Sequence, residues 1–484
     1  MRLEEYEFGF ADAEKEFSRV PEIFERAFYD FRGTVDKLMK SYYFLLIGRK
    51  GVGKSAVSAR IQSISNHDSN FHAFPVQLND FEFATFAKTS IDKELVGTQK
   101  YKDSWDLILL LTAVKIVNRE MNLNGNKELK KLLASLDDLG FASHTDYKND
   151  VTRLSKLKVG ANMAIFDLVF EKEFGSKPDS FLERVSTLKE KIIDVLNIFD
   201  YRNNQITLLI DGVDDILRIK KNQLEILMSL IRSVDYLNDK FHSKKIPIKV
   251  ILFIREDIVN KVTDPDLNKI KRDGAILLNW NSKIDDLKSV VNLRFEYSGL
   301  SKEDAINQWD VIFPKKIRNR DSWQYILDHT LYKPRDILQL LKCAQSIYPE
   351  KQKLSYSEIR NVLKDYSKNY FIEEMKNEIT GFIDDSYINC LPPIFQKIGE
   401  RSFSLHEFSR YVEEQISKPE NDKDARYLLL LLFEAGYVGQ LISNTRNSGK
   451  SVMFKYWNEN SQIDYSNHFI IHKGLYNGLG IRGI

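Results

Sequence analysis

Eight residues, G-R-K-G-V-G-K-S at Gly48–Ser55, restrict the possible folds of this chain more than any other feature. They match the pattern G-x-x-x-x-G-K-[ST], and they lie between an apolar run, 42–47, and a helical pattern, 55–65. The three glycines permit backbone torsions with positive φ, so that successive N–H groups can point inward and bind phosphate at the positive end of the helix. Strand, loop and helix in this order predict an α/β fold with a phosphate-binding loop.

The lysine and serine at the end of this loop have side chains suited to a triphosphate and its metal. The Lys54 ammonium is expected to reach the β and γ phosphates, and the Ser55 hydroxyl is expected to bind Mg²⁺. We therefore predict that the chain binds ATP together with Mg²⁺, and GTP is the alternative nucleotide. The alternatives are a chance glycine turn and a loop that binds nucleotide without hydrolysing it. The predicted nucleotide-binding residues are Gly48, Arg49, Lys50, Gly51, Val52, Gly53, Lys54 and Ser55.

An acidic segment, I-T-L-L-I-D-G-V-D-D at 206–215, follows further along the chain. Its apolar part predicts a buried strand ending at Asp211, and open α/β sheets present ligand-binding groups at the carboxyl ends of their strands. We expect Asp211 to hold Mg²⁺ through water, and Asp214 or Asp215 to polarise the water that attacks the γ-phosphate. The alternative is that all three aspartates cap the helix that follows.

Three arginines are candidates for sensing the γ-phosphate. Arg255 ends the strand predicted at 250–254, so we expect it beside Asp211 in the sheet. Arg335 follows a proline, which favours the first turn of a helix, and it could reach over the nucleotide. Arg272 could act across a subunit interface. For each arginine the alternative is a solvated surface charge. The predicted catalytic residues are Asp214, Asp215, Arg255 and Arg335.

The length of 484 residues is too great for one core of ordinary size, so several domains are expected. Strand and helix patterns alternate in the first part of the chain, which predicts a parallel sheet with helices on both faces. Strands are expected at 42–47, 71–77, 206–210, 250–254 and 275–278. The expected domains are an N-terminal helical segment (1–40), an α/β core (41–280) with a helical insertion at about 123–199, a helical lid (281–375) and a winged helix-turn-helix (376–484).

Three apolar patterns outside these strands bear on the fold. The stretch 159–170, within the insertion, could form a pair of strands or a buried helix. The run 107–113 is much shorter than the roughly 18 residues of a membrane span, and it is expected in a buried helix or strand. From about 387 onward the pattern predicts three helices and then two strands, at 451–457 and 468–472.

Composition argues against several classes of function. Basic and acidic residues nearly balance, with a net charge of +2, so only a local patch could attract nucleic acid. Cys343 and Cys390 form no C-x-x-C pair, and the eight histidines have no ligand spacing, which argues against a disulfide framework and a zinc site. Because the N-terminus has no apolar signal region, we expect a cytoplasmic protein without a membrane partner.

Taken together, these motifs resemble the AAA+ and STAND branch of P-loop ATPases over about residues 40–345. The string D-G-V-D-D is similar to the Walker B element of NACHT and KAP proteins, and P-R at 334–335 resembles the second sensor of AAA+ proteins. Core, lid and winged helix in this order resemble the origin-recognition initiators. The closing string H-K-G-L, at 472–475, resembles bacterial P-loop ATPases of mobile-element and phage-defence loci. The resemblance implies a Mg²⁺-dependent ATPase and favours ATP over GTP.

Two features depart from that pattern. Lys54 and Asp211 are 157 positions apart, which implies an insertion in the core. Arg255 stands where initiators usually carry a small polar residue, so the resemblance does not extend to initiator function.

Three functions are therefore open. The first is an ATP-driven switch with weak basal hydrolysis, in which the lid and the winged domain move and an effector protein or further copies of the chain take part. The second is DNA binding by the winged domain, where six Lys or Arg stand against three acids from Arg426 onward; a protein-binding winged helix is the alternative. The third is an adaptor in which nucleotide controls assembly without turnover.

Overall fold

The structure is a computed structural model and describes residues 1–78, 83–89, 101–120, 126–141, 147–157, 181–212, 221–261, 265–282, 284–416, 422–443, 450–458 and 460–481. The chain forms two compact units. The sheet unit, as we call it, comprises Arg32–Arg49 and Lys54–Leu278. The helical unit comprises Met1–Phe31, Lys50–Gly53 and Asn279–Ile484.

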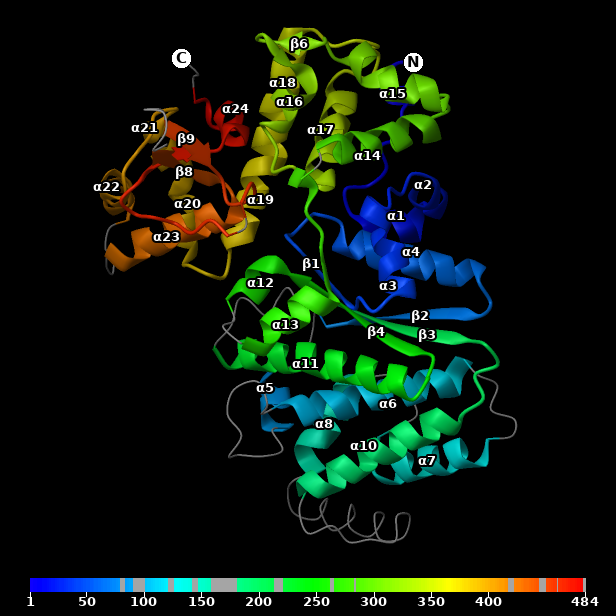
Figure 1. Ribbon diagram of the computed structural model, residues 1–484. Coiled ribbons are helices and arrows are strands. Elements are labelled where there is room, and N and C mark those ends of the chain that lie inside the picture. Colours follow the sequence, from blue (N-terminus) through cyan, green and yellow to red (C-terminus); the bar gives the residue numbers. More distant parts are fainter. Residues whose placement is uncertain are drawn as a thin grey trace. The chain divides into compact units, whose positions relative to one another are not determined.

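A five-stranded parallel sheet forms the centre of the sheet unit, in the order β2-β3-β4-β1-β5 (Figure 1). Short runs rich in isoleucine, leucine and valine favour strands that are buried on both faces, and β3 and β4 are buried along most of their length. The strands are β1 (Leu45–Gly48), β2 (Phe71–Gln77), β3 (Gln205–Asp211), β4 (Ile248–Arg255) and β5 (Ala275–Leu277). The predicted α/β fold and its five strands are confirmed.

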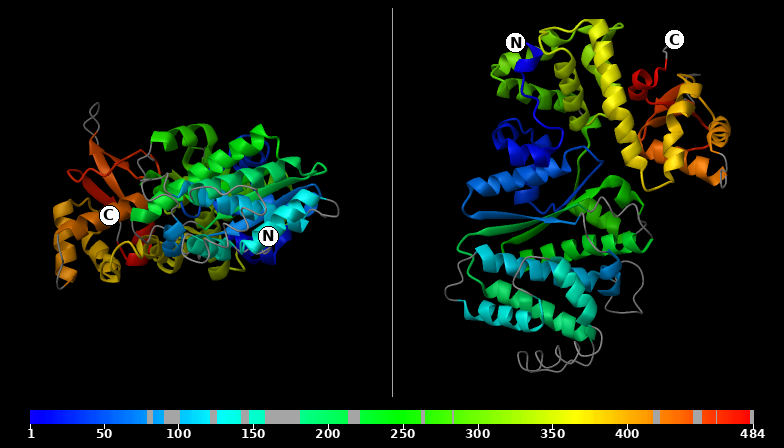
Figure 2. Two further views of the ribbon diagram at one scale, coloured as in Figure 1. Left: turned by 90° about the horizontal axis from the view of Figure 1, so that it is seen from below. Right: turned by 180° about the vertical axis from the view of Figure 1, so that it is seen from behind.

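Helices cover both faces of this sheet, as predicted (Figures 1 and 2). On one face lie α3 (Thr34–Lys40) and α4 (Lys54–His67), and on the other lies α11 (Lys221–Ser243). Outside α11 lie α6 (Lys102–Glu120) and then α10 (Phe181–Ile198). The other described helices of the unit include α5 (Phe83–Phe86), η3 (Ala87–Thr89), α7 (Lys127–Asp138), α8 (Tyr147–Leu157), α12 (Glu256–Asn260) and α13 (Pro265–Gly274).

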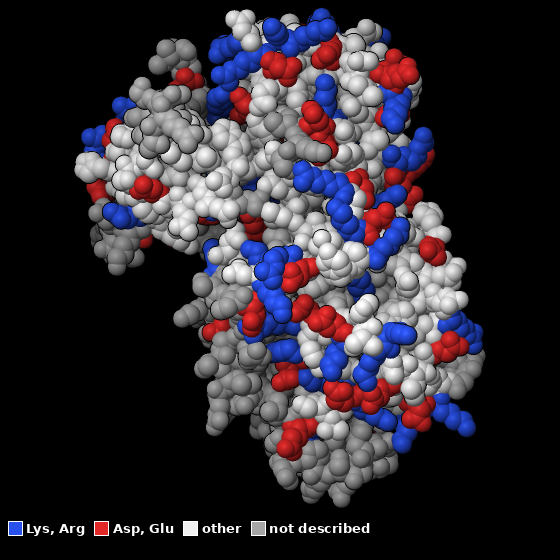
Figure 3. Space-filling view, in the orientation of Figure 1, with Lys and Arg blue, Asp and Glu red and all other residues white. Residues whose placement is uncertain are grey.

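The apolar run 107–113 lies in α6, where every residue from Ser104 to Val117 is buried. A helix that is buried on all sides is typical of a large core, and α6 packs between α10 and α11. Within the described residues no helix combines the length and the hydrophobicity that crossing a bilayer requires. On the face shown in Figure 3, basic and acidic side chains are interspersed over most of the described surface, in keeping with the balanced composition.

Buried ion pairs join α8 and α10, which lie in the segment expected to be an insertion, to α6. Lys115 of α6 donates to both carboxylate oxygens of Asp150 in α8, at 2.7 and 2.8 Å, and both residues are almost fully buried. Lys189 of α10 donates to Asp106 of α6 at 3.0 Å. Charges this deeply buried are tolerated when they are paired and hydrogen-bonded. The stretch 159–170, for which the sequence pattern allows a pair of strands or a buried helix, lies outside the described residues.

In the helical unit, the N-terminal residues pack on helices from the second half of the chain. The backbone N–H of Leu3 donates to the Lys351 carbonyl at 2.7 Å. A buried ion pair joins Glu16 to Arg294 of α14 at 2.8 Å. The described elements up to residue 379 are η1 (Leu3–Glu5), α1 (Ala13–Arg19), α2 (Pro21–Arg26), η6 (Trp280–Ser282), α14 (Ile284–Tyr297), α15 (Lys302–Ile312), β6 (Lys316–Ile317), β7 (Arg320–Asp321), α16 (Ser322–Leu327), α17 (Pro334–Ile347), α18 (Tyr356–Tyr366), η7 (Ser367–Phe371) and α19 (Ile372–Ile379).

The C-terminal part combines helices with an antiparallel sheet in the order β10-β8-β9. This sheet has three strands, so the expectation of two was wrong: β8 directly follows α23 and was not recognised, and the expected strand at 451–457 is shorter and begins earlier. A bridge from Phe403 to Phe469 extends the sheet. The elements are α20 (Asp385–Asn389), α21 (Leu391–Ile398), α22 (Leu405–Gln415), α23 (Asp422–Ala435), β8 (Val438–Ser443), β9 (Lys450–Met453), β10 (His468–Ile471), η8 (Lys473–Leu475) and α24 (Tyr476–Leu479).

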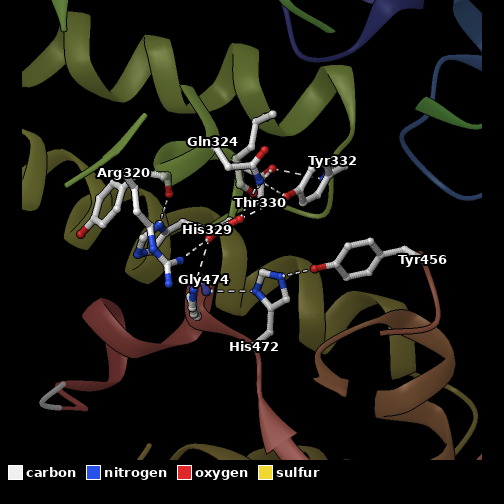
Figure 4. Close-up of polar contacts among 12 residues, drawn as sticks. Arg320, Gln324, His329, Thr330, Tyr332, Tyr456, His472 and Gly474 are labelled. Carbon is white, nitrogen blue, oxygen red and sulfur yellow. Dashed lines mark hydrogen bonds and ion pairs between the residues drawn. The ribbon is translucent and has the colours of Figure 1, made fainter. Parts of the chain in front are cut away.

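The closing H-K-G-L string is held by polar contacts that Figure 4 shows. The Gly474 N–H donates to His472 Nδ1 at 3.0 Å. Because an N–H can only donate, Nδ1 is the acceptor, and the hydrogen of the neutral ring lies on Nε2, 2.9 Å from the Tyr456 hydroxyl. A Cβ on Gly474 would come within 2.6 Å of the His329 carbonyl oxygen, so only glycine permits this approach. The string therefore fixes the C-terminal strands to the segment before α17.

Candidate nucleotide site

The loop between β1 and α4 contains the residues predicted to bind phosphate. Gly51 and Gly53 have φ of +79° and +105°, which L residues rarely adopt without strain. Gly48 is not among the residues with positive φ; it ends β1 and pairs with Arg255 of β4. The expectation of a positive φ therefore holds for Gly51 and Gly53 and is wrong for Gly48.

Lys54 begins α4, and it is only 6% exposed. Its Nζ donates to the carbonyl oxygens of Gly48 and Arg49, at 3.1 and 3.3 Å. The ammonium therefore lies against the backbone of its own loop, at the N-terminus of a helix of 14 residues. Since a helix N-terminus favours negative charge, ammonium and helix both favour phosphate here.

Ser55 and Asp211, which are far apart in the sequence, meet at the carboxyl edge of the sheet. The Ser55 hydroxyl donates to Asp211 Oδ2 at 3.0 Å, and the Gly212 N–H donates to Oδ1 at 2.7 Å. Neighbouring ligands of an octahedral Mg²⁺, each 2.0–2.1 Å from the ion, are separated by about 2.9 Å. The observed spacing of the hydroxyl and carboxylate oxygens therefore suits two ligands of one such ion, and Asp211 is only 6% exposed.

Arg255 ends β4, the strand that lies between β3 and β1. Its register partner is Gly48 of β1, at the start of the phosphate loop. The guanidinium is 12% exposed and forms a bidentate pair with Asp257, at 2.9 and 2.7 Å. Arg255 is therefore in the strand next to Asp211, as expected, and its guanidinium is paired with a carboxylate two residues further on.

The crest of the phosphate loop, residues 50–53, belongs to the helical unit. Trp280, which is 5% exposed, donates from its indole N–H to the Val52 carbonyl at 2.8 Å. The Lys50 ammonium lies 3.5 Å from Glu374 of α19. Two side chains of the helical unit therefore contact the loop crest: Trp280 through a hydrogen bond and Glu374 through an ion pair.

Two cationic residues at the start of α17 pack against Gly51. A Cβ on Gly51 would lie 3.4 Å from Lys333 Cδ and 3.7 Å from Arg335 Cδ. Arg335 Nε donates to the Ala11 carbonyl at 3.2 Å. The Lys333 ammonium lies 3.7 Å from Glu378 of α19, and both side chains are more than nine-tenths buried. The loop crest therefore has two further cations beside it, one of them buried.

The first turn of α17 is held by a buried carboxylate. Asp336 accepts from the Leu331 N–H at 2.8 Å and from the Tyr370 hydroxyl at 3.0 Å. Burial raises the pKa of Asp336 above its usual value, although Lys333 opposes this shift. Burial likewise raises the pKa of Tyr370, so its hydroxyl remains a donor at neutral pH. These bonds fix the direction from which Lys333 and Arg335 approach the loop.

The structure describes one of the three other sequence candidates. Asp214 and Asp215 lie outside the described residues. Arg272 lies on α13 with a side chain 75% exposed, and it pairs with its neighbour Asp273 at 3.1 Å. This hydrogen bond raises the pKa of Arg272, and no contact of Arg272 with the described nucleotide-loop residues occurs.

Sequence reasoning missed four residues of this site: Trp280, Lys333, Glu374 and Glu378. Trp280 and the two glutamates carry no local signal, because each is more than 200 positions from the loop that it helps to hold. Lys333 had a weak signal, since it directly precedes the Pro-Arg pair.

A parallel sheet, a phosphate loop before its first core helix, and an acidic residue at a strand end beside the loop serine define an α/β protein of the P-loop class. Residues 285–373, which begin in α14 and end in α19, match the family described as the FunZ-associated C-terminal helical domain. This match covers the helical region that follows the sheet unit.

The chain is also similar to a protein of Escherichia coli (strain K12) described as a transposon gamma-delta 80.3 kDa protein. The two are 21% identical over 447 residues, which cover 86% of this chain and 59% of that protein. The chain thus spans less than two thirds of its relative's length. Among solved structures, Cdc6p from Pyrobaculum aerophilum aligns over 98% of both chains with 10% identity and a TM-score of 0.29. A score of that size establishes no common fold, so the fold assignment above depends on the strand order and the loop.

Proposed function

We propose that this chain is a Mg²⁺-dependent ATP-binding and ATP-hydrolysing switch of the AAA+/STAND type. The observation that carries the proposal is the Ser55 hydroxyl 3.0 Å from Asp211 at the end of β3, directly beside the buried Lys54. Lys54 and the loop N–H groups would bind the β and γ phosphates. Ser55 and Asp211 would hold Mg²⁺, which neutralises charge on the phosphates when bound. Asp214 or Asp215 would orient water, and Arg255 and Arg335 would sense the γ-phosphate.

Replacing Asp211 by asparagine tests the metal part of the proposal. We expect Mg²⁺ to raise the ATP affinity of the wild type about tenfold or more, and the Asp211→Asn variant to lose most of that increase, because an amide oxygen carries no net charge. Titration calorimetry with and without Mg²⁺ measures both values. Asp200→Asn, at a carboxylate with 83% exposure in the same unit, is the matched control and should behave as wild type. Equal affinity of the wild type with and without Mg²⁺ would contradict the metal site.

The coupling of nucleotide to movement is proposed to run through α19. Glu374 and Glu378, one turn apart on this helix, pair with Lys50 and Lys333 beside the loop. A triphosphate on the loop would compete with these carboxylates for the same two cations. Because α19 leads directly into the C-terminal helices, weaker ion pairs between α19 and these two lysines would allow nucleotide binding to change the position of that part of the chain.

Removing the charge of Glu374 should therefore raise the affinity for nucleotide. We expect Glu374→Gln to bind Mg-ATP about two- to fivefold more tightly than wild type, since a partly exposed pair contributes about 0.2–1 kcal/mol. Glu373→Gln is the matched control, because Glu373 lies on the same helix and pairs with Lys376 instead of the loop. An affinity that is unchanged, or that changes equally in both variants, would show that the Glu374 pair does not oppose nucleotide binding.

The setting of the switch is proposed to be a bacterial defence or DNA-associated complex, acting with an effector protein or with further copies of the chain. Similarity to a protein that is named for a transposon supports the association with mobile DNA. Two alternatives remain testable: ATP-regulated DNA binding by a winged helix at 376–484, and a non-hydrolysing assembly adaptor. The three-stranded sheet that follows α21, α22 and α23 supports a winged-helix reading of the C-terminal part.

A further inference from the structure

A row of exposed side chains follows one face of α18 and continues into η7. Tyr356, Arg360, Lys364 and Lys368 occur at intervals of four residues, which makes each one a neighbour of the next on the helix surface. All four are exposed, and Tyr356 has 39% of its surface accessible. At a rise of 1.5 Å per residue the row is ~18 Å long. We call these four residues the α18 row.

The β6–β7 hairpin adds further cations at the Tyr356 end of this row. The tip residues Arg318 and Asn319 have φ of +48° and +62°, which is typical of a tight two-residue hairpin turn. The Arg318 guanidinium lies over the Tyr356 ring, 5.8 Å from its centroid. Between 315 and 321 the chain has four basic residues and one acidic residue. Lys and Arg side chains gather over β6 and α18 at the top of the view in Figure 3.

The three cations of the α18 row are not neutralised by acids of the described chain. No described carboxylate forms an ion pair with Arg360, Lys364 or Lys368, whereas many other surface cations of the helical unit are paired, as Lys351 is with Glu358. A row of like charges at i, i+4 spacing lowers the stability of a helix slightly. A regular row of unpaired cations is best suited to a polymer with regularly repeated negative charge, such as the backbone of a nucleic acid.

Two helices of the C-terminal part, α22 and α23, have the opposite character. α22 contains one arginine and three glutamates, and α23 contains two basic and three acidic residues. In a winged helix-turn-helix one of these helices would have to enter the major groove, where the phosphates of the two strands repel acidic side chains. The charge distribution therefore favours the helical domain at 285–373 over the C-terminal helices as the contact for nucleic acid.

We propose that the α18 row and the β6–β7 hairpin form a surface that binds the phosphate backbone of double-stranded DNA without reading its sequence. At 3.4 Å per base pair, ~18 Å of row faces about five base pairs. The Arg and Lys side chains contact phosphates, and the Tyr356 ring packs against the Arg318 guanidinium. Affinity at this surface decreases as salt rises, because each phosphate contact releases a counterion.

The test measures binding of the full-length chain to a 25-base-pair duplex by fluorescence anisotropy over a range of salt concentrations. In the triple variant Arg360→Gln, Lys364→Gln and Lys368→Gln, the slope of log affinity against log salt should fall by about 2–3, and the affinity should fall about tenfold or more at low salt. The matched control replaces three other exposed cations of the same unit, Lys15→Gln, Arg19→Gln and Lys302→Gln. It changes the net charge equally and should retain the wild-type slope.

In the duplex measurement, two outcomes would overturn the proposal: a triple variant that binds duplex with the wild-type slope, or an equal loss in the control, which would indicate attraction by net charge alone. Vesicles of anionic phospholipid provide a second probe. Binding of the wild type to vesicles with no binding to duplex would also overturn it, in favour of a membrane surface. Circular dichroism and ATP titration should match wild type for every variant, since the row lies apart from the nucleotide loop in sequence and its residues are not among the described partners of that loop.

Discussion

Lys54→Ala is expected to weaken Mg-ATP binding by at least about 100-fold and to abolish phosphate release. Charge-assisted hydrogen bonds contribute about 1.5–3 kcal/mol each, and Lys54 supplies the one side chain proposed to contact both the β and γ phosphates. The Lys54 side chain is buried and donates to the loop carbonyls of Gly48 and Arg49. Titration calorimetry measures the affinity, and steady-state phosphate release measures turnover.

Lys40→Ala is the matched control, because Lys40 belongs to the same unit and its side chain is 72% exposed. It should bind and turn over ATP as wild type does. If the wild type binds no nucleotide in the presence of Mg²⁺, or if Lys54→Ala binds as tightly as wild type, the proposed nucleotide site is wrong.

The same measurements separate the switch from the adaptor. A switch should release phosphate slowly, and Asp215→Ala should release less than wild type while still binding ATP. An adaptor should bind ATP through Lys54 and show equal, background release in wild type and Asp215→Ala, even with DNA present. Mass measurement with and without a non-hydrolysable analogue then shows whether nucleotide changes the oligomeric state.

The second large effect is expected from a buried ion pair far from the nucleotide loop. Asp150→Ala should lower the free energy of unfolding of the sheet unit by about 3–5 kcal/mol, because it leaves the ammonium of Lys115 buried without its carboxylate. Lys115 is 2% exposed and Asp150 is 1% exposed, so water cannot take the place of the lost partner without local opening. Urea unfolding, followed by circular dichroism, measures the change in midpoint.

Two further variants show whether burial of the ion pair causes the loss of stability in Asp150→Ala. In the double variant Lys115→Met with Asp150→Leu, most of the stability should return, since replacing both partners by apolar residues of similar size removes the unpaired charge. Asp36→Ala breaks the exposed pair with Lys40 at 2.7 Å, where the side chains are 68% and 72% exposed, and should cost less than about 1 kcal/mol. Equal losses for Asp150→Ala and Asp36→Ala would contradict this account.

Local patterns in the sequence were sufficient to predict the fold class and to propose the central residues of the candidate site. Alternation of apolar strands with helices predicted the parallel sheet, because a strand buried on both faces needs a continuous run of apolar residues, such as 206–210. The phosphate loop was recognisable because its glycines, lysine and serine are adjacent in the chain. Asp211 was found because it ends such a strand. Where the pattern was weak, as at β8 directly after α23, the strand was missed.

Only the tertiary structure decided which distant residues share the site. The strand order places β4 between β3 and β1, and this aligns Arg255 with Gly48 while Asp257 pairs with its guanidinium. Nothing local to Trp280 or Glu374 indicates that they hold a loop more than 200 positions away, because such contacts depend on how helices pack and not on the residues beside them. The sequence by itself therefore determined which candidate phosphate-binding and metal-binding groups the chain contains. Packing decided which carboxylates and cations lie beside the phosphate loop. Ion pairs and hydrogen bonds form between groups that are near in space, whatever their separation along the chain.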